Sequence, residues 1–184
     1  GAPANNFVRL QTRFFWLDAL SRQDPSGDLG EAQISLISAA ALAACDPADG
    51  VVDGIIGDPL RCGFDPQSLL CPPGRSENCL TREQAERARR IYGPARTEAG
   101  TELYPGNAYG VVPFVVIPNV ATEPMIMKVV PAAERRRTAQ TFDPDRDMAE
   151  HEERTGRSLG AWNPDLRRFR DSGGKLVVWH GWND

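Results

Sequence analysis

The residues best suited to chemistry in this chain are the aspartates between Cys45 and Cys62. Asp46, Asp49 and Asp53 follow one another at short intervals, and a glycine comes directly after two of them. A hard cation such as Ca²⁺ prefers carboxylate and backbone carbonyl oxygens, and glycines let a short segment wrap around it. Without a metal, carboxylates this close together would repel one another. The stretch is therefore a candidate calcium loop.

In that interpretation the backbone carbonyls of Val51 and Ile55 would add to the oxygen ligands. The order D-x-x-D-G-x-x-D-G is not the EF-hand order D-x-D-x-D-G, so the stretch does not match that motif. Asp and Gly are also the commonest turn formers, and a solvated turn cluster would use the same residues. The spacing by itself leaves both interpretations open.

The four cysteines form no C-x-x-C pair, and the chain has only two histidines, which argues against zinc. Four cysteines allow three disulfide connectivities, of which the sequential one would close two short loops in turn-rich sequence. Buried reduced thiols are the less favoured alternative, because Cys62, Cys71 and Cys79 lie in Pro- and Gly-rich segments. Disulfides indicate an oxidising compartment, so we expect a secreted or periplasmic protein.

The composition is that of an ordinary globular protein, with 184 residues, 41% hydrophobic and 25% charged. This length suits one domain or a domain and part of another. The net charge of −4 gives no electrostatic reason to expect nucleic acid or an anionic membrane surface as a partner. No apolar run approaches the roughly 18 residues that a membrane-spanning helix needs.

The two ends predict that the chain is an internal fragment of a longer protein. It begins Gly1-Ala2, without an initiator methionine, and it ends at Asp184, shortly after the apolar run 175–179. A strand that is buried on both faces needs neighbouring strands, so a domain rarely ends directly after one.

Hydrophobic periodicity and capping residues predict a mostly helical and irregular chain with one closing helix–strand unit, an α+β fragment. A capping box is expected where Thr81 and Gln84 face each other, and the arginines of the helix that follows are predicted to form a solvated face. The predicted helices cover 7–20, 31–44, 82–91, 148–154 and the residues from Asn163 to Gly173, and the predicted strand covers 175–179.

Aromatic residues after the third predicted helix are candidates for contact with a planar substrate, if this region faces a cleft. They are Tyr104 in a predicted turn, Tyr109, and Phe114 in the apolar segment 110–118, which its prolines limit to a sheet edge or an irregular covering segment. For each of them singly, ordinary core packing is the favoured interpretation.

Landmarks along the whole chain resemble those of one family, the tannase and feruloyl esterase group of serine esterases, which are α/β-hydrolases with a large lid. The most specific are the aspartate loop and the closing strand. The matching pieces are Gly1-Ala2-Pro3-Ala4, the loop from Cys45 to Cys62, Cys79-Leu80-Thr81 with Gln84, Ile91-Tyr92-Gly93-Pro94, Tyr104-Pro105-Gly106, Asn163-Pro164-Asp165-Leu166, Gly173-Gly174-Lys175-Leu176 and Trp179-His180-Gly181-Trp182-Asn183-Asp184.

The resemblance implies a structural calcium ion in the lid and a pairing of the four cysteines. By position, the ligand role falls to the carboxylates of Asp46, Asp49 and Asp53 and to the carbonyls of Val51 and Ile55. The implied disulfides are Cys45–Cys62 and Cys71–Cys79.

The resemblance also makes Asp184 the acid of a catalytic triad, where it would orient the catalytic imidazole and stabilise its charged form. In α/β-hydrolases the triad order is Ser, Asp, His, so the serine would precede Gly1 and the histidine would follow Asp184. His180 belongs to the strand motif of the family and is not expected to be the general base.

We therefore expect the end of a core strand or loop in residues 1–6, a lid in 7–160 with its calcium loop in 45–62, and a core helix and strand in 161–184. The expected function is that of a secreted carboxylic-ester hydrolase for small aromatic esters of the feruloyl or galloyl type, completed by the rest of the hydrolase core and inactive as this fragment. Residues 106–143 look shortened and lack the tryptophan-rich stretch that is associated with substrate contact in the family's lid, so no substrate contact is assigned. The alternatives are a calcium-stabilised binding or covering domain without catalysis, and an esterase for aromatic diacid monoesters.

Overall fold

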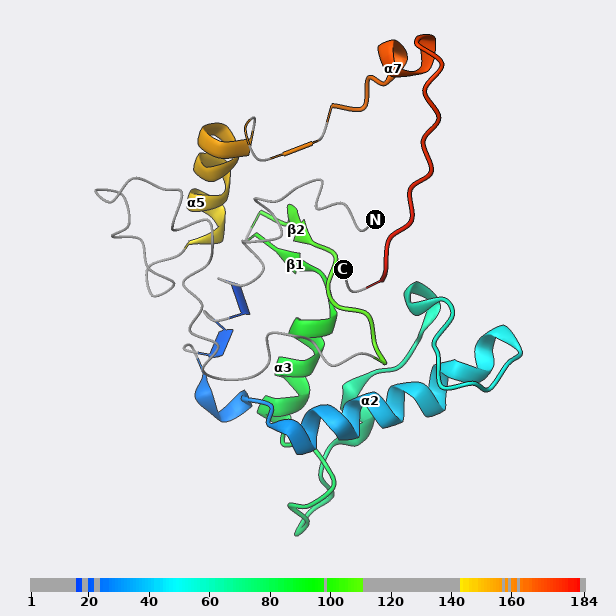
Figure 1. Cartoon of the computed structure of the whole chain (residues 1–184). Coiled ribbons are helices and arrows are strands. Elements are labelled where there is room, and N and C mark those ends of the chain that lie inside the picture. Colours follow the sequence, from blue (N-terminus) through cyan, green and yellow to red (C-terminus); the bar gives the residue numbers. More distant parts are fainter. Residues whose placement is uncertain are drawn as a thin grey trace.

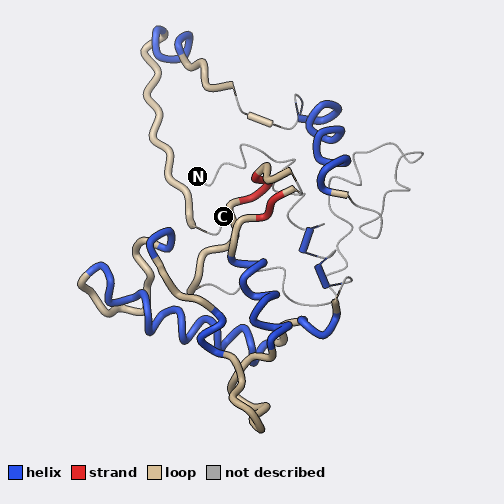
Figure 2. The backbone as a smooth tube through the Cα atoms, turned by 180° about the vertical axis from the view of Figure 1, so that it is seen from behind, coloured by secondary structure: helices blue, strands red, loops and turns tan. Residues whose placement is uncertain are grey.

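The computed structural model describes residues 16–17, 20–21, 24–97, 99–110, 143–156, 158, 160–161 and 163–182. This part of the chain is mainly helical, with one small sheet (Figures 1 and 2). The longer elements are the helices α2 (Glu31–Cys45), α3 (Arg82–Tyr92), α5 (Pro144–His151) and α7 (Arg167–Asp171), and the strands β1 (Ala95–Arg96) and β2 (Glu102–Tyr104). The short helical turns are η1 (Pro25–Gly27), η2 (Asp46–Asp49), η3 (Pro59–Arg61), η4 (Pro66–Leu69) and the π-helical turn η6 (Glu152–Gly156).

Helix α2 confirms the second predicted helix and extends it by one residue. Alanines favour helix, and the Gln33 side chain accepts a hydrogen bond from the Gly30 amide at 3.1 Å. Its buried residues are Ile34, Ile37, Ala41 and Cys45, which recur on one side of the helix. This side packs on α3 and on the turns around it, forming the main hydrophobic core.

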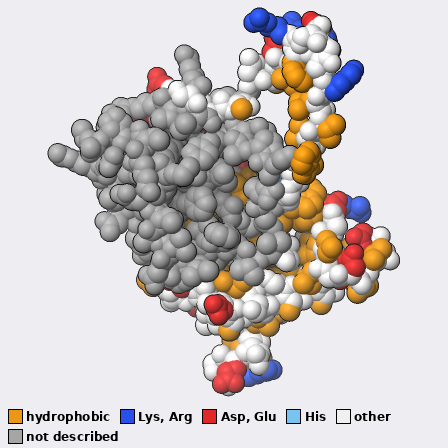
Figure 3. Space-filling view, viewed as in Figure 1, with side chains coloured by type: hydrophobic (Ala, Val, Ile, Leu, Met, Phe, Trp, Pro, Cys, Tyr) orange, Lys and Arg blue, Asp and Glu red, His pale blue; other side chains and the backbone are white. Residues whose placement is uncertain are grey.

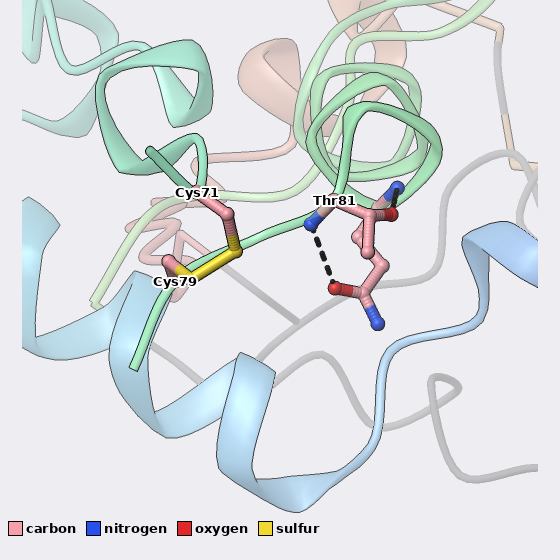
Figure 4. Close-up of a disulfide and its surroundings, with 4 residues drawn as sticks. Cys71, Cys79 and Thr81 are labelled. Carbon is pink, nitrogen blue, oxygen red and sulfur yellow. Dashed lines mark hydrogen bonds between the residues drawn. A yellow bond between two sulfur atoms is a disulfide. The ribbon is translucent and has the colours of Figure 1, made fainter. Parts of the chain in front are cut away.

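Helix α3 begins at the predicted capping box. The Thr81 hydroxyl accepts from the Gln84 amide at 3.2 Å, and the Gln84 side chain accepts from the Thr81 amide at 3.1 Å. The disulfide Cys71–Cys79 lies directly before this cap (Figure 4). The helix ends at Tyr92, before Gly93-Pro94.

The prediction of a fully solvated arginine face on α3 was wrong for one residue. Arg87 is buried, with 7% of its surface exposed. Its guanidinium donates to the Asp28 carboxylate at 2.9 Å and to the carbonyls of Leu20 and Asp24 at 2.5 and 2.6 Å. It thereby ties the segment before α2 to α3, with partners that lie about sixty residues away in the sequence and leave no local pattern.

The small sheet was not predicted. Strands β1 and β2 pair antiparallel, with Ala95 opposite Tyr104. The predicted turn at 103–106 therefore begins two residues too early, because Leu103 and Tyr104 end a strand. Gly106, at φ +100°, makes the turn, and a Cβ there would lie 2.3 Å from the Tyr92 carbonyl oxygen. Only glycine fits so close to the end of α3.

The C-terminal helix–strand unit differs from the prediction. Helix α7 begins at Arg167, four residues after Asn163, and the segment that follows it forms no strand among the described residues. The segment 172–182 instead extends from α7 as an arm with exposed hydrophobic side chains (Figures 1 and 3). A strand needs a hydrogen-bonded neighbour, which the described part of this chain does not offer to the arm.

Two other predicted helices meet the described residues only in part. The first, over 7–20, falls mostly outside them, although residues 16, 17, 20 and 21 are helical. The fourth begins at Pro144, earlier than predicted, and continues into η6. Within the described residues, no helix is both long and apolar enough to cross a membrane.

Candidate functional site

The aspartate loop, defined as residues 45–62, contains a four-residue repeat that folds the same way twice. Asp49-Gly50-Val51-Val52 is followed by Asp53-Gly54-Ile55-Ile56. Asp49 accepts from the amide of Val51 at 2.9 Å, and Asp53 accepts from the amide of Ile55 at 3.0 Å. Both glycines have positive φ, +92° and +82°, where a Cβ would be strained. Each unit is thus a tight turn closed by its own aspartate.

Asp46 binds the backbone of the second Asp-Gly unit. Its side chain is buried, and its two carboxylate oxygens accept from the amides of Asp53 at 3.2 Å and Gly54 at 3.0 Å. Hydrogen bonds from these two amides stabilise the carboxylate and offset part of the free-energy cost of burying it. Asp46 is therefore the residue that fixes the loop to the end of α2.

The donor set of the loop suits a hard cation. Three carboxylates and two backbone carbonyls, those of Val51 and Ile55, lie within ten residues, and each carboxylate oxygen that accepts one amide retains a further lone pair. The carboxylates point to amides of the loop in this structure, and the described residues contain no group of three or more His, Cys, Asp or Glu side chains gathered as a metal site. By their chemistry these residues fit calcium, whose binding would require the three carboxylates to converge.

Two disulfides close the aspartate loop and the loop that follows it, in the pairing that the family resemblance implies. Cys45–Cys62, with Cα atoms 5.3 Å apart, closes the aspartate loop, and Cys71–Cys79, at 4.8 Å, closes the next one. No cysteine in the chain remains free. The second disulfide supports the bridge between Leu70 and Leu80, in which the Cys71 amide donates to the Leu80 carbonyl at 2.9 Å.

Of the aromatic candidates, Tyr109 packs against the core, as the favoured interpretation predicted. Its ring stacks on Tyr92 with centroids 4.4 Å apart, and Phe64 meets it edge-on at 5.2 Å. Burial, reinforced by the charge of Asp65, raises the pKa of Tyr109 to about 12. Burial also raises the pKa of Tyr92. Neither hydroxyl would ionise at neutral pH, so neither offers a phenolate base.

Several predicted site residues fall outside the described part of the chain. Asp184, the predicted triad acid, and Phe114 are among them. His180 is described and exposed, and its Nδ1 lies 3.0 Å from the Gly181 carbonyl oxygen. The structure therefore brings together the aspartate loop and the disulfides but does not test the catalytic prediction.

Sequence reasoning did not single out Ile56 or the burial of Asp46. The duplicated Asp-Gly unit was a usable signal, because Val52 and Ile56 occupy equivalent positions in it. Val52 is 77% exposed and Ile56 is 7% exposed. Which copy is buried depends on contacts with α2, which local sequence does not encode.

Comparison with known proteins decides the family. The family model described as tannase and feruloyl esterase matches residues 1–184. This chain belongs to that family. An uncharacterised esterase of Xanthomonas campestris is 30% identical over 210 residues, and a probable feruloyl esterase B-2 of Aspergillus terreus is 30% identical over 200 residues. Both alignments cover 100% of this chain.

The members of the tannase and feruloyl esterase family that match are much longer than this chain. It spans 36% of the length of each of the two relatives. The crystal structure of feruloyl esterase B from Aspergillus oryzae matches with a TM-score of 0.86 and 26% identity, over 100% of this chain and 38% of that one. The fold described above is therefore that of about one third of a larger family member.

Proposed function

We propose that this chain is the lid, with flanking pieces of the core, of a secreted serine carboxylic-ester hydrolase that acts on aromatic esters of the feruloyl or galloyl type. The observation that carries the proposal is the family match over all 184 residues, together with relatives named as feruloyl esterases. In the proposed division, residues 1–6 and 161–184 belong to the α/β-hydrolase core and 7–160 to the lid. The two disulfides favour an oxidising compartment.

The exposed arm supports the proposed division of the chain. Leu176, Val177, Val178 and Trp179 are 59, 81, 58 and 66% exposed, although all are of the kind that proteins bury. A run of this composition suits a strand in a parallel sheet covered on both faces. In the proposal, strands of the larger protein would pair with the arm and bury these side chains.

The proposed reaction is acyl transfer through a serine ester, with the serine and the histidine supplied by segments outside this chain. Asp184 would accept a hydrogen bond from the catalytic imidazole, hold it in the productive tautomer and stabilise the imidazolium. Backbone donors near the serine would stabilise the tetrahedral oxyanion. The leaving group would be the alcohol of the ester, and water would release the aromatic acid in the second step.

Calcium is proposed as a structural ion on the aspartate loop. Asp46, Asp49 and Asp53 would supply carboxylate oxygens, and Val51 and Ile55 would supply carbonyls. The divalent ion would offset two of the three clustered negative charges and hold the two turns together.

The deciding experiment is turnover by the full-length protein of methyl ferulate, a gallate ester and an aromatic diacid monoester, with Asp184→Asn as the paired variant. We expect hydrolysis of at least one ester by the wild type, and a kcat about ten-thousandfold lower in the variant with an unchanged thermal transition. Equal kcat values in both proteins would remove Asp184 from the triad. If the wild type hydrolyses none of the three esters, the alternative of a non-catalytic binding domain stands.

A further inference from the structure

Of the apolar side chains between Cys45 and Cys62, a stretch that is described throughout, Ile56 is the one that is buried. Ile56 forms a hydrophobic cluster with Ala41 and Cys45 of α2, and both neighbours are buried like it. Val52, in the equivalent position of the first Asp-Gly unit, is exposed to solvent. The last side chain of the first Asp-Gly unit is therefore exposed to solvent, and that of the second packs on α2.

Gly110 lies directly against this side chain. It has φ +86°, and a Cβ added there would lie 3.2 Å from the Ile56 Cδ1 atom and 3.6 Å from the Leu42 Cδ2 atom. The backbone conformation favours glycine, and the close approach leaves little room for a side chain. Figure 1 shows how the segment after β2 runs back to the C-terminal half of α2, where it meets the aspartate loop.

Tyr109, the residue before Gly110, packs against aromatic rings of the core. Its ring lies between Tyr92 of α3 and Phe64, and it packs against both hydrophobic clusters of the core. Residues 109 and 110 are thus fixed by α3 on one side and by the aspartate loop on the other. From here the chain continues into residue 111 and beyond.

The position of Ile56 in turn depends on the acidic part of the loop. Asp46 accepts from the amides of Asp53 and Gly54, three and two residues before Ile56, and the disulfide Cys45–Cys62 closes the loop around it. A change in the conformation of the aspartate loop therefore reaches Ile56 through the short segment 53–56, which is hydrogen-bonded to Asp46.

We propose that Ile56 and Gly110 form a joint through which the aspartate loop fixes Tyr109 and Gly110 against the α2–α3 core. Ile56 is a positioning residue in this device. The contact itself does not require a metal. Its control by calcium rests on the proposed function, since an ion that orders the loop would order residues 109–110 through Ile56.

Hydrogen exchange of the full-length protein tests the joint. In Ile56→Ala we expect amides of residues 106–110 to exchange about tenfold faster, which corresponds to an opening free energy lower by about 1.4 kcal/mol. Val52→Ala, which truncates the side chain at the equivalent position to the same alanine, should leave this exchange unchanged. The reciprocal variant Gly110→Ala should speed exchange at residues 53–56. Unchanged exchange at 106–110 in Ile56→Ala, or a uniform rise throughout α2 and α3, overturns the joint.

A calcium chelator separates this inference from the metal proposal. In the wild type we expect chelation to speed exchange both at 46–56 and at 106–110, and in Ile56→Ala at 46–56 alone. A wild-type response confined to 46–56 supports the metal and overturns the joint. If neither segment of the wild type responds, the metal proposal fails, and the joint is decided by the metal-free comparison of Ile56→Ala with Val52→Ala.

Discussion

At the scale of single residues, the most consequential side chain of the core is a charged one. Arg87 is buried and satisfies three acceptors at once, the Asp28 carboxylate and the carbonyls of Leu20 and Asp24. The planar guanidinium presents several donors in a fixed fork, whereas a lysine ammonium is a compact point charge that does not match this geometry. Ser21 also donates to Asp28, at 2.7 Å, so the carboxylate belongs to a small network.

We predict that Arg87→Met lowers the free energy of unfolding by about 3 kcal/mol, because it removes the charged partner of a half-buried carboxylate and a charged donor from two carbonyls. Arg87→Lys should recover only part of this loss. Arg82→Met is the matched control, since Arg82 lies on the same helix and is exposed. Urea unfolding monitored by circular dichroism measures all three variants. A loss in Arg87→Met no greater than in Arg82→Met would contradict the role of the fork.

Residues whose role depends on near neighbours in the sequence were predictable, and those with distant partners were not. Thr81 and Gln84 are three residues apart, so their capping box was visible in the sequence. Arg87 lies 59 residues from Asp28, and within its own helix it looks like any other arginine. The same holds for Ile56, which is one apolar residue among several until α2 and Gly110 lie next to it.

At the scale of elements, α2 and α3 were predicted because their caps and apolar spacing are local. The pair β1 and β2 was missed because each strand has only two or three residues, too few to show an alternating pattern. For the aspartate loop, the sequence predicted the donor types, whereas the orientation of the carboxylates toward loop amides required coordinates.

The aspartate loop should respond to calcium as an element. A ligand that binds only the folded state stabilises it by mass action, by about 2.7 kcal/mol at one hundred times its dissociation constant. We predict that chelation lowers the melting temperature of the wild type and that added calcium restores it. Asp49→Asn should abolish most of this response. Asp58→Asn, also on the loop but outside the proposed ligand set, should retain it. Calorimetry with and without calcium would contradict the site if the wild-type transition does not move.

The aromatic cluster that joins α3 to Tyr109 should make the structure sensitive to alkaline pH. Burial raises the pKa of Tyr109 from 10.0 to about 12, so between these values the unfolded chain releases the proton and the folded chain keeps it. The unfolded state then binds fewer protons, and stability falls as pH rises through this window. Tyr109→Phe should show a shallower fall in urea midpoint from pH 9 to 11.5. An identical slope would mean that Tyr109 ionises without cost in the folded state.

At the scale of the whole molecule, the described residues form a hydrophobic core around α2 and α3 and an arm whose hydrophobic side chains are exposed. The α2–α3 core is closed by disulfides and buried side chains, whereas Leu176 to Trp179 expose most of their surface. The strand prediction for 175–179 was made from composition, which reflects the environment of a complete sheet. Within the described part of this chain no neighbouring strand is present, so the same residues remain extended and exposed (Figure 3).

This contrast leads to a prediction in which one substitution has opposite consequences in two contexts. In residues 1–184 alone, Val177→Asp changes a side chain that is 81% exposed. It should change the free energy of unfolding by no more than about 0.5 kcal/mol, and the melting temperature should hardly move. In the full-length protein the proposed sheet would bury the new carboxylate without a partner, at a cost of several kcal/mol. We therefore expect normal yield of the isolated chain and loss of folded full-length protein. Equal tolerance in both contexts would show that the arm is not a core strand.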